Sequence, residues 1–396
     1  MSLLVRACTA TSALGAGLVP TLAALQEGRS GLAARRWESV DLDTCIGEVA
    51  GLDDETVRPD LATFDCRNNR LAQIALNQDG FAEQVNDAVR RYGRRRIAII
   101  LGTSTSGILS SEIAYRHRDP ATGALPAGHD YRHTHNSFSV ADFVRRYFDV
   151  LGPALVISTA CSSSAKAFGS AQRLLAAGLI DAVVVGGVDS LCLTTLYGFN
   201  SLQLVSSRPC RPFDVHRDGI SIGEGAAFAL VEDGSRAERG DILVSGIGES
   251  SDAHHMSSPH PDGLGARMAM QAALVSAGLE SDDIDYINLH GTATRGNDAA
   301  EGKAVEAMFG TRTLCSSTKG HTGHTLGAAG AVEAVIGVLA LRHGLAPGGI
   351  GTQVLDPELG CHYLMANRAQ PLRHVLSNSF GFGGSNCCLV LSRVPQ

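Results

Sequence analysis

Short apolar runs bounded by glycine, proline or aspartate recur along the whole chain. Four of them, at 97–101, 154–157, 182–185 and 284–289, have the length and composition of buried strands. After the second run, apolar residues recur every three or four positions over 164–179, which predicts a helix with one buried face. This alternation of short strands with alanine-rich helical segments predicts a layered α/β architecture.

The same pattern divides the chain into two similar halves, each opened and closed by an apolar run. These runs are residues 3–5 and 227–231 in one half, and 242–244 and 388–391 in the other. The polar stretch 232–240 separates them and predicts the junction. We therefore expect an N-terminal half over 1–238 and a C-terminal half over 239–396.

Composition and charge narrow the functional classes. A chain of 396 residues with 44% hydrophobic content can bury a large core. Its 33 basic and 40 acidic residues give a net charge of −7, which argues against nucleic acid as the main partner. The longest apolar helical candidate, 326–341, is interrupted by Glu333, so no membrane span is expected. The first basic residue follows the first apolar run, the wrong order for a signal peptide, and a cytoplasmic protein is expected.

The ten cysteines are scattered and form no CxxC pair, which indicates neither a zinc site nor a disulfide framework. His321 and His324 have the spacing of a metal-binding pair, but the neighbouring sequence offers no third ligand. We therefore expect no metal site, and a reducing compartment fits the cysteine usage.

Cys161 differs from the other cysteines in its position between an apolar strand and a helix. The start of a helix favours a thiolate through the helix dipole and free backbone N–H groups. The same N–H groups can stabilise the oxyanion that forms when a thioester is attacked. The alternative is a small buried residue chosen for packing, which is the usual role of a cysteine in a cytosolic protein.

Two histidines strengthen the interpretation of Cys161 as a nucleophile. His290 directly follows the apolar run 284–289, and His324 precedes a small-residue helix. Two neutral imidazoles that donate Nε2–H bonds can hold a thioester oxygen as it gains enolate charge. A single histidine would more naturally act as a base for the thiol, as in a protease. Lys319 lies in a nearly uncharged segment, and a buried ion pair with Glu301 would fix the loop that carries His324.

A glycine-rich loop at 381–386 lacks the spacing of a phosphate-binding loop, and a strand follows it instead of a helix. Its glycines permit close backbone approach to a substrate. The backbone N–H groups of Phe382 and Cys161 are therefore predicted to form an oxyanion hole.

Taken together, these motifs resemble the β-ketoacyl-acyl carrier protein synthases of the elongating type. The segments that carry the resemblance are 159–161, 212–226, 290–294, 319–330 and 378–386. The resemblance spans nearly the whole chain and implies a thiolase-like fold, with two similar halves in five αβαβα layers. It also implies decarboxylative condensation of malonyl-carrier protein with an acyl group held as a thioester on Cys161.

The resemblance implies a role for each matched residue. It makes His290 and His324 the thioester-binding pair, Lys319 and Glu301 a supporting ion pair, and Asp298 a supporting residue behind the site. Thr292 and Thr294 would contact the pantetheine arm. Phe382 would be the oxyanion donor, and Phe380 would be a gate beside the acyl pocket. No cofactor is expected, because both substrates are carried on the phosphopantetheine of acyl carrier protein.

The expected partners are acyl carrier protein and a second synthase-like subunit, in a homodimer or a heterodimer. An acidic carrier protein needs a basic docking surface, and Arg67 and Arg70 are the first candidates for it. The irregular stretch 116–135 is expected on the surface or at a subunit contact.

Departures from the family pattern bear on the pathway. Arg295 stands where a proline commonly follows the first histidine motif, and the histidine motifs are similar to those of polyene-type secondary metabolite synthases. Fatty acid elongation and a polyene or polyketide pathway therefore both stay open. A chain-length-factor-like partner and a thiolase of the same fold are the alternative functions.

Overall fold

The computed structural model describes residues 1–34 and 37–395. Its main feature is a 12-stranded mixed sheet in the order β13-β11-β10-β15-β16-β9-β1-β8-β7-β5-β6, with β2 paired to β1. The strands of this sheet are β1 (Leu3–Ser12), β2 (Gly15–Ala16), β5 (Ile97–Gly102), β6 (Ala154–Ile157), β7 (Ala182–Asp189), β8 (Gly225–Asp233), β9 (Ile242–Ser251), β10 (Tyr286–Asn288), β11 (Leu314–Ser316), β13 (His362–Tyr363), β15 (His374–Gly381) and β16 (Ser385–Arg393). Two small sheets pair β3 (Ala33–Ala34) with β4 (Cys45–Ile46), and β12 (Leu345–Ala346) with β14 (Arg368–Ala369).

The two halves of the sheet repeat one topology. In the first half β1, β8 and β7 are antiparallel neighbours, and β5 and β6 continue in parallel. In the second half β9, β16 and β15 are antiparallel, and β10 and β11 continue in parallel. The expectation of two similar halves is confirmed by this matching order. The expected boundary after residue 238 lies between β8 and β9.

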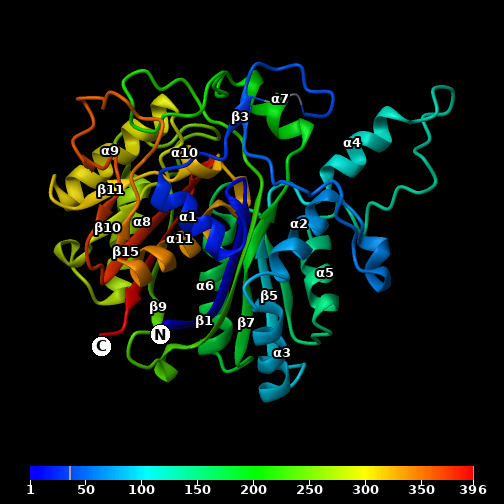
Figure 1. Ribbon diagram of the computed structural model, residues 1–396, viewed down its shortest axis with the longest axis horizontal. Helices are drawn as coiled ribbons and strands as arrows, with labels where there is room; N and C mark the ends of the chain where they lie inside the picture. Colours follow the sequence, from blue (N-terminus) through cyan, green and yellow to red (C-terminus); the bar gives the residue numbers. More distant parts are fainter. Residues whose placement is uncertain (35–36, 396) are drawn as a thin grey trace.

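Helices cover the two halves on the outside and fill the space between them. They are α1 (Leu18–Glu27), α2 (Arg67–Leu76), α3 (Phe81–Tyr92), α4 (Ile108–Arg116), α5 (Ser139–Tyr147), α6 (Ser163–Ala176), α7 (Leu193–Ser201), α8 (Leu264–Ala277), α9 (Arg295–Phe309), α10 (Lys319–Thr322) and α11 (Ala329–His343). Figure 1 shows α6 and α11 at the centre, with α2, α3 and α5 beside the first half and α8 and α9 beside the second.

Three hydrophobic clusters hold these layers together. The inner cluster joins α6 and α11 to strands of both halves, and its members include Phe168, Val185, Val335 and Val375. One outer cluster packs α2, α3 and α5 on the first half, and the other packs α8 and α9 on the second. Central helices with a sheet half and an outer helix layer on either side make the five αβαβα layers of a thiolase-like fold, as expected.

Most predicted elements are present with shifted ends. Ile97–Gly102, Ala154–Ile157 and Ala182–Asp189 are strands, and the helix predicted over 164–179 is Ser163–Ala176. The run at 284–289 contains only a three-residue strand, Tyr286–Asn288. Its shortness leaves His290 two residues beyond the strand, where the chain turns.

The apolar run that contains α11 is longer than the sequence interpretation allowed. Leu326–His343 has the 18 residues and the mean hydropathy of 1.4 that a membrane-spanning helix would need, by length and composition alone. However, 89% of it is buried inside the protein, because α11 lies between the two halves of the sheet. It is the central helix of the core.

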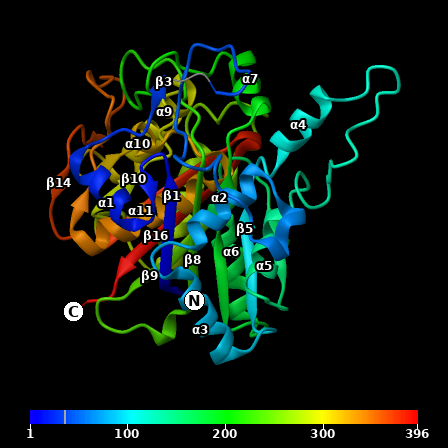
Figure 2. The same cartoon turned by 45° about the vertical axis from the view of Figure 1, so that its right-hand side comes forward.

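An arm formed by α4 and the loop that follows it extends away from the body, as Figures 1 and 2 both show. Between residues 116 and 130 nearly every residue of the arm is exposed, so the expected surface segment is confirmed over this part, whereas Thr134 near its end is buried. The connection from β5 to the base of the arm reaches the turn after β6, since Ser104 in it donates to Ala160 O.

Candidate active site

Cys161 lies in a tight turn between β6 and α6. The preceding residue, Ala160, has a φ of 52°, a left-handed conformation that is uncommon for a residue with a side chain. Ser163 helps to hold the turn, since its Oγ accepts from Thr159 N at 2.9 Å and donates to Ala160 O. Only 6% of Cys161 is exposed. The predicted strand-to-helix position is therefore correct, and the thiol lies inside the protein.

The glycine loop after β15 packs directly against this turn. A Cβ atom at Gly381 would lie 2.7 Å from Thr159 O and 3.3 Å from Cys161 N, so only glycine fits there without displacing the turn. The backbone N–H of Phe382 faces the Cys161 thiol and acts to lower its pKa, against the larger effect of burial. The N–H groups of Cys161 and Phe382 thus come from two adjoining loops, as the predicted oxyanion hole requires.

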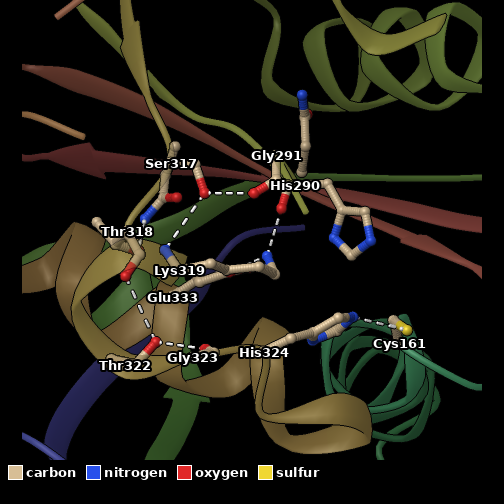
Figure 3. A network of polar contacts seen from close by, with 12 residues as sticks. Cys161, His290, Gly291, Ser317, Thr318, Lys319, Thr322, Gly323, His324 and Glu333 are labelled. Atoms are coloured by element: carbon tan, nitrogen blue, oxygen red, sulfur yellow. Dashed lines mark hydrogen bonds and ion pairs between the residues drawn. The ribbon is translucent and has the colours of Figure 1, made fainter. Parts of the chain in front are cut away.

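Both candidate histidines face the thiol. The Nε2 atom of His324 lies 3.0 Å from Cys161 Sγ, and the two imidazole rings are 5.3 Å apart in an edge-to-face arrangement. The Cys161 sulfur and one ring nitrogen of each histidine all lie within 4.8 Å of one another. Figure 3 shows His324 pointing toward Cys161, with His290 above it. The structure therefore brings together residues that are separated by up to 163 positions in sequence.

The tautomer of His324 follows from its backbone contact. The N–H of Leu326 donates to His324 Nδ1 at 3.2 Å, so Nδ1 carries the lone pair and Nε2 carries the proton of the neutral ring. The Nε2–H group therefore donates toward Cys161 Sγ. His324 is arranged as a hydrogen-bond donor at this position, not as a base for the thiol.

Burial sets the charge state of all three groups. Burial raises the pKa of Cys161 to about 12, and the positive charge of Lys319 only partly opposes this effect. Burial and the same lysine hold the pKa of His324 well below its ordinary range, and the pKa of His290 is lowered in the same way. A helix start favours a thiolate, as noted in the sequence, but desolvation outweighs that effect here. Near neutral pH the site holds a thiol and two neutral imidazoles.

The predicted ion pair between Lys319 and Glu301 is wrong. Lys319 Nζ instead donates to Glu333 Oε1 and to His290 O, each at 2.5 Å (Figure 3). Lys319 is 1% exposed and Glu333 is 3% exposed. Glu333 projects from α11 and was noted in the sequence only as an interruption of an apolar run. A lone acid in a buried helix, a short distance after a lysine, was the signal that could have identified this pair.

Glu301 supports His290 through the backbone. Its carboxylate accepts the N–H groups of His290 at 2.8 Å and Gly291 at 2.7 Å, and the side-chain amide of Asn378 at 3.0 Å. Burial raises the pKa of Glu301 to about 7. Asp298, one turn earlier on α9, accepts the N–H of Ala293 at 3.2 Å. Both acids therefore hold the turn after β10, which places His290.

A cavity of about 190 Å³ opens onto the thiol and the two histidines. Thr292, Thr294, Phe380 and Phe382 all line it, together with Cys161, so the structure places the predicted substrate contacts in one space. The Oγ1 atoms of Thr292 and Thr294 are 2.9 Å apart, a pair of hydroxyls available to an amide-bearing chain.

The structure does not place Arg67 at a docking surface. Arg67 is 8% exposed, forms two hydrogen bonds to Glu224 at 2.7 and 2.9 Å, and pairs with Asp53. The prediction for Arg67 is therefore wrong, because the bidentate pair buries its guanidinium. Arg70 is partly exposed and pairs with Asp65, and it remains a candidate.

His321 does not lie in the active site beside His324. Its ring nitrogens lie 3.0 Å from Arg29 O and 3.1 Å from Gly348 O, in a separate buried position. The spacing of the two histidines therefore reflects two different structural roles.

Comparisons with known proteins agree with this geometry. Residues 4–237 match the family described as "Beta-ketoacyl synthase, N-terminal domain", and residues 242–353 match "Beta-ketoacyl synthase, C-terminal domain". A 3-oxoacyl-[acyl-carrier-protein] synthase 2 from Coxiella burnetii is 39% identical over 264 residues, which cover 62% of this chain and 63% of that protein. The chain thus spans somewhat less than two thirds of the length of this curated relative. A putative polyketide beta-ketoacyl synthase 1 from Streptomyces halstedii is 34% identical over 86% of this chain and 84% of its own length.

Solved structures match over nearly the full length. The ketosynthase ApeO in complex with its chain length factor ApeC, from Xenorhabdus doucetiae, has a TM-score of 0.88 and 39% identity, covering 99% of this chain and 98% of that one. The ishigamide ketosynthase/chain length factor has a TM-score of 0.89 and 25% identity, with coverage of 99% and 98%.

Proposed function

The chain belongs to the β-ketoacyl synthase family, and on this basis we propose that it condenses malonyl-acyl carrier protein with an acyl group held on Cys161. The observation that carries the proposal is the arrangement of the thiol with two neutral imidazoles, one of which donates Nε2–H toward it at 3.0 Å. A protease-type pair would need the opposite tautomer, with Nε2 as the proton acceptor.

In the first step the sulfur of Cys161 attacks the thioester carbonyl of an acyl-carrier protein. The developing oxyanion accepts hydrogen bonds from the backbone N–H groups of Cys161 and Phe382. The carrier's thiolate leaves and the proton of the Cys161 thiol transfers to it, so the step needs no net acid or base. The charge of Lys319 stabilises the sulfur while it is anionic.

In the second step the two histidines bind the carbonyl oxygen of malonyl-carrier protein. The bond to the carboxylate breaks, carbon dioxide leaves, and the electron pair forms an enolate on the thioester. Donors fixed in a buried site favour this enolate over the ground state, because its oxygen carries more negative charge. Neutral rings serve this purpose, and burial keeps both histidines neutral.

In the third step the enolate carbon attacks the acyl carbonyl on Cys161. The tetrahedral intermediate uses the same two backbone N–H groups and collapses to a β-ketoacyl-carrier protein and the Cys161 thiolate. A proton from solvent then restores the thiol, the form that burial favours. This proton is the one that the overall decarboxylative condensation consumes.

The proposal includes partners, compartment and pathway. Acyl carrier protein delivers both substrates on its phosphopantetheine arm, so no resident cofactor takes part, and the reaction occurs in the cytoplasm. A second synthase-like subunit, identical or related, completes the enzyme; the similarity to ApeO, which is paired with a chain length factor, supports a related one. The acyl chain belongs to fatty acid or polyene-type elongation. The intact Cys161, His290 and His324 set disfavours a non-catalytic chain-length partner.

Acyl loading tests the proposal directly. Wild-type protein incubated with acyl-carrier protein should gain one acyl mass on Cys161 by intact mass spectrometry, and Cys161→Ala should gain none. Cys8→Ala is the matched control, since Cys8 is a buried cysteine of β1 with a raised pKa. An acyl adduct on Cys161→Ala, or none on the wild type, would overturn the proposal.

A further inference from the structure

Asp189, the last residue of β7, is a fully buried acid that the mechanism above does not use. Its Oδ1 accepts from the hydroxyl of Thr103 at 2.7 Å, and from the N–H and hydroxyl of Thr105 at 2.8 Å each. It also accepts the N–H of Ser104 at 2.8 Å, and its Oδ2 accepts the N–H of Gly327 at 2.5 Å. One carboxylate therefore joins the loop after β5 to the segment that follows His324.

The contacts identify Asp189 as an ionised carboxylate. The N–H groups of Ser104, Thr105 and Gly327 can only donate, so both carboxylate oxygens of Asp189 act as acceptors. Burial raises the pKa of Asp189, and these donors oppose that effect only in part. Within residues 1–34 and 37–395, no basic side chain forms an ion pair with Asp189. Its charge is thus held by hydrogen bonds to two loops of the active site.

The contact to Gly327 controls the turn that carries His324. Leu326 has a φ of 54°, and its N–H is the group that fixes His324 Nδ1 as an acceptor. Gly327 follows directly, and a Cβ atom there would lie 2.7 Å from Asp189 Oδ2. A strained conformation of this kind persists only where surrounding contacts hold it. Asp189 supplies such a contact one residue away from the N–H that sets the histidine tautomer.

A second connection runs to the nucleophile turn. Ser104, whose N–H binds Asp189, donates its hydroxyl to Ala160 O at 3.3 Å. Ala160 is the residue of left-handed conformation that precedes Cys161. The carboxylate therefore reaches the nucleophile turn only indirectly, through Ser104 and a longer bond than its own 2.5 Å contact to Gly327.

We propose that Asp189 is a positioning residue for the condensation, which holds the turn after His324 so that Nε2–H points at Cys161 and the bound thioester. The proposal rests on the function proposed above. Because Asp189 touches neither substrate nor thiol, its effect should reach the step that uses the histidines most strongly, which is decarboxylation.

Asp189→Asn tests this with two rates measured on the same preparation. An amide keeps the size of the side chain but replaces one carboxylate oxygen with an NH2 group. The NH2 group cannot accept a hydrogen bond, so either the N–H of Gly327 or that of Thr105 loses its acceptor. We expect carbon dioxide release from malonyl-carrier protein to fall by up to about 100-fold, the loss that a misplacement of about 1 Å in a reacting group can cause. Acyl loading on Cys161 should stay near the wild-type rate. An equal loss of both rates, or no loss of decarboxylation, would overturn the proposal.

Gly327→Ala provides a second route to the same contact while the carboxylate remains, because its methyl group would lie 2.7 Å from both Asp189 Oδ2 and Ser104 Oγ and would force this junction to shift. It should show the same selective loss of decarboxylation, and the double variant should be little worse than either single one. Additive losses would mean that the two residues act separately, contrary to the proposal.

A spectroscopic measurement separates this proposal from the proposed function. The ¹⁵N spectrum of His324, assigned by its loss in His324→Ala, should show the Nε2–H tautomer in the wild type and a mixture in Asp189→Asn. This result does not depend on turnover. A wild-type protein that never loads an acyl group would refute the condensing activity alone, whereas an unchanged tautomer in Asp189→Asn would refute the positioning role.

Discussion

Lys319 and Glu333 form a buried ion pair, with Nζ and Oε1 2.5 Å apart, beneath the carbonyl of His290. The pair links α10 to the central helix α11, and the bond to His290 O extends it to the turn after β10. One lysine thus connects three segments of the C-terminal half that meet at the thiol. The same charge lowers the pKa of Cys161 and of His324, so the pair acts on the site electrostatically as well as structurally.

Removing the carboxylate of this pair should destabilise the protein strongly. Glu333→Ala leaves a buried ammonium without its anion, and breaking a buried pair in this way costs about 3–5 kcal/mol. Denaturant unfolding should show this loss. The double variant Glu333→Leu with Lys319→Met replaces both charges with apolar groups and should recover much of the stability. A single variant as stable as the wild type would contradict the interpretation.

The thiol of Cys161 should react slowly with alkylating reagents at neutral pH. Because only the thiolate reacts and the pKa is about 12, the rate of iodoacetamide modification should rise about tenfold for each pH unit from 7 to 10. Lys319 lowers this pKa, so Lys319→Met should raise it and slow the reaction at every pH. Peptide mass spectrometry of Cys161 measures the rate. A plateau near pH 8 would show that the thiolate is already formed.

The N-terminal part of the site could be predicted from local sequence, and its electrostatics could not. An apolar run, a small turn and a helical pattern suffice to place Cys161 at a strand-to-helix turn. Its pKa depends on how deeply Gly381 and α11 pack against that turn, which no local pattern encodes. The partner of Lys319 was missed for the same reason. Glu301 is nearer to His290 in sequence, but its carboxylate is occupied by two backbone N–H groups, and Glu333 faces the lysine from the next helix.

Loss of one histidine should separate loading from decarboxylation. His324→Ala keeps the backbone N–H groups of Cys161 and Phe382, so the acyl group should still reach Cys161. Decarboxylation of malonyl-carrier protein should fall about 10²- to 10³-fold, the usual effect of removing one oxyanion donor. Intact mass spectrometry measures the adduct and a carbon dioxide assay the second step. Normal carbon dioxide release from this variant would rule out the role of His324.

Arg67 and Arg70 should differ in what their loss affects. Arg67→Ala leaves Glu224 buried and unpaired, so it should lower stability by about 3–5 kcal/mol. Arg70→Ala removes a partly exposed charge, so its stability should change by less than about 1 kcal/mol. If Arg70 contacts the carrier, its variant should raise the KM for acyl-carrier protein, and the difference should shrink at high salt. An unchanged KM at low salt would remove Arg70 as a docking residue.

Glu301 should make the stability of the protein depend on pH. Its pKa is about 7 in the folded protein and 4.5 as its ordinary value, so the folded state binds the proton more tightly than the unfolded state. Stability from this group is therefore fully present below pH 4.5 and is lost as pH rises through 7, by up to about 3 kcal/mol. Glu301→Gln cannot ionise at this position, so the free energy of unfolding of the variant should depend less on pH. Denaturant unfolding of both proteins at pH 5.5 and 8 measures the free energies of unfolding. The free energy of the variant minus that of the wild type should be more favourable at pH 8 than at pH 5.5. An equal pH slope in the two proteins would show that Glu301 has an ordinary pKa, with its hydrogen bonds to His290 and Gly291 offsetting burial.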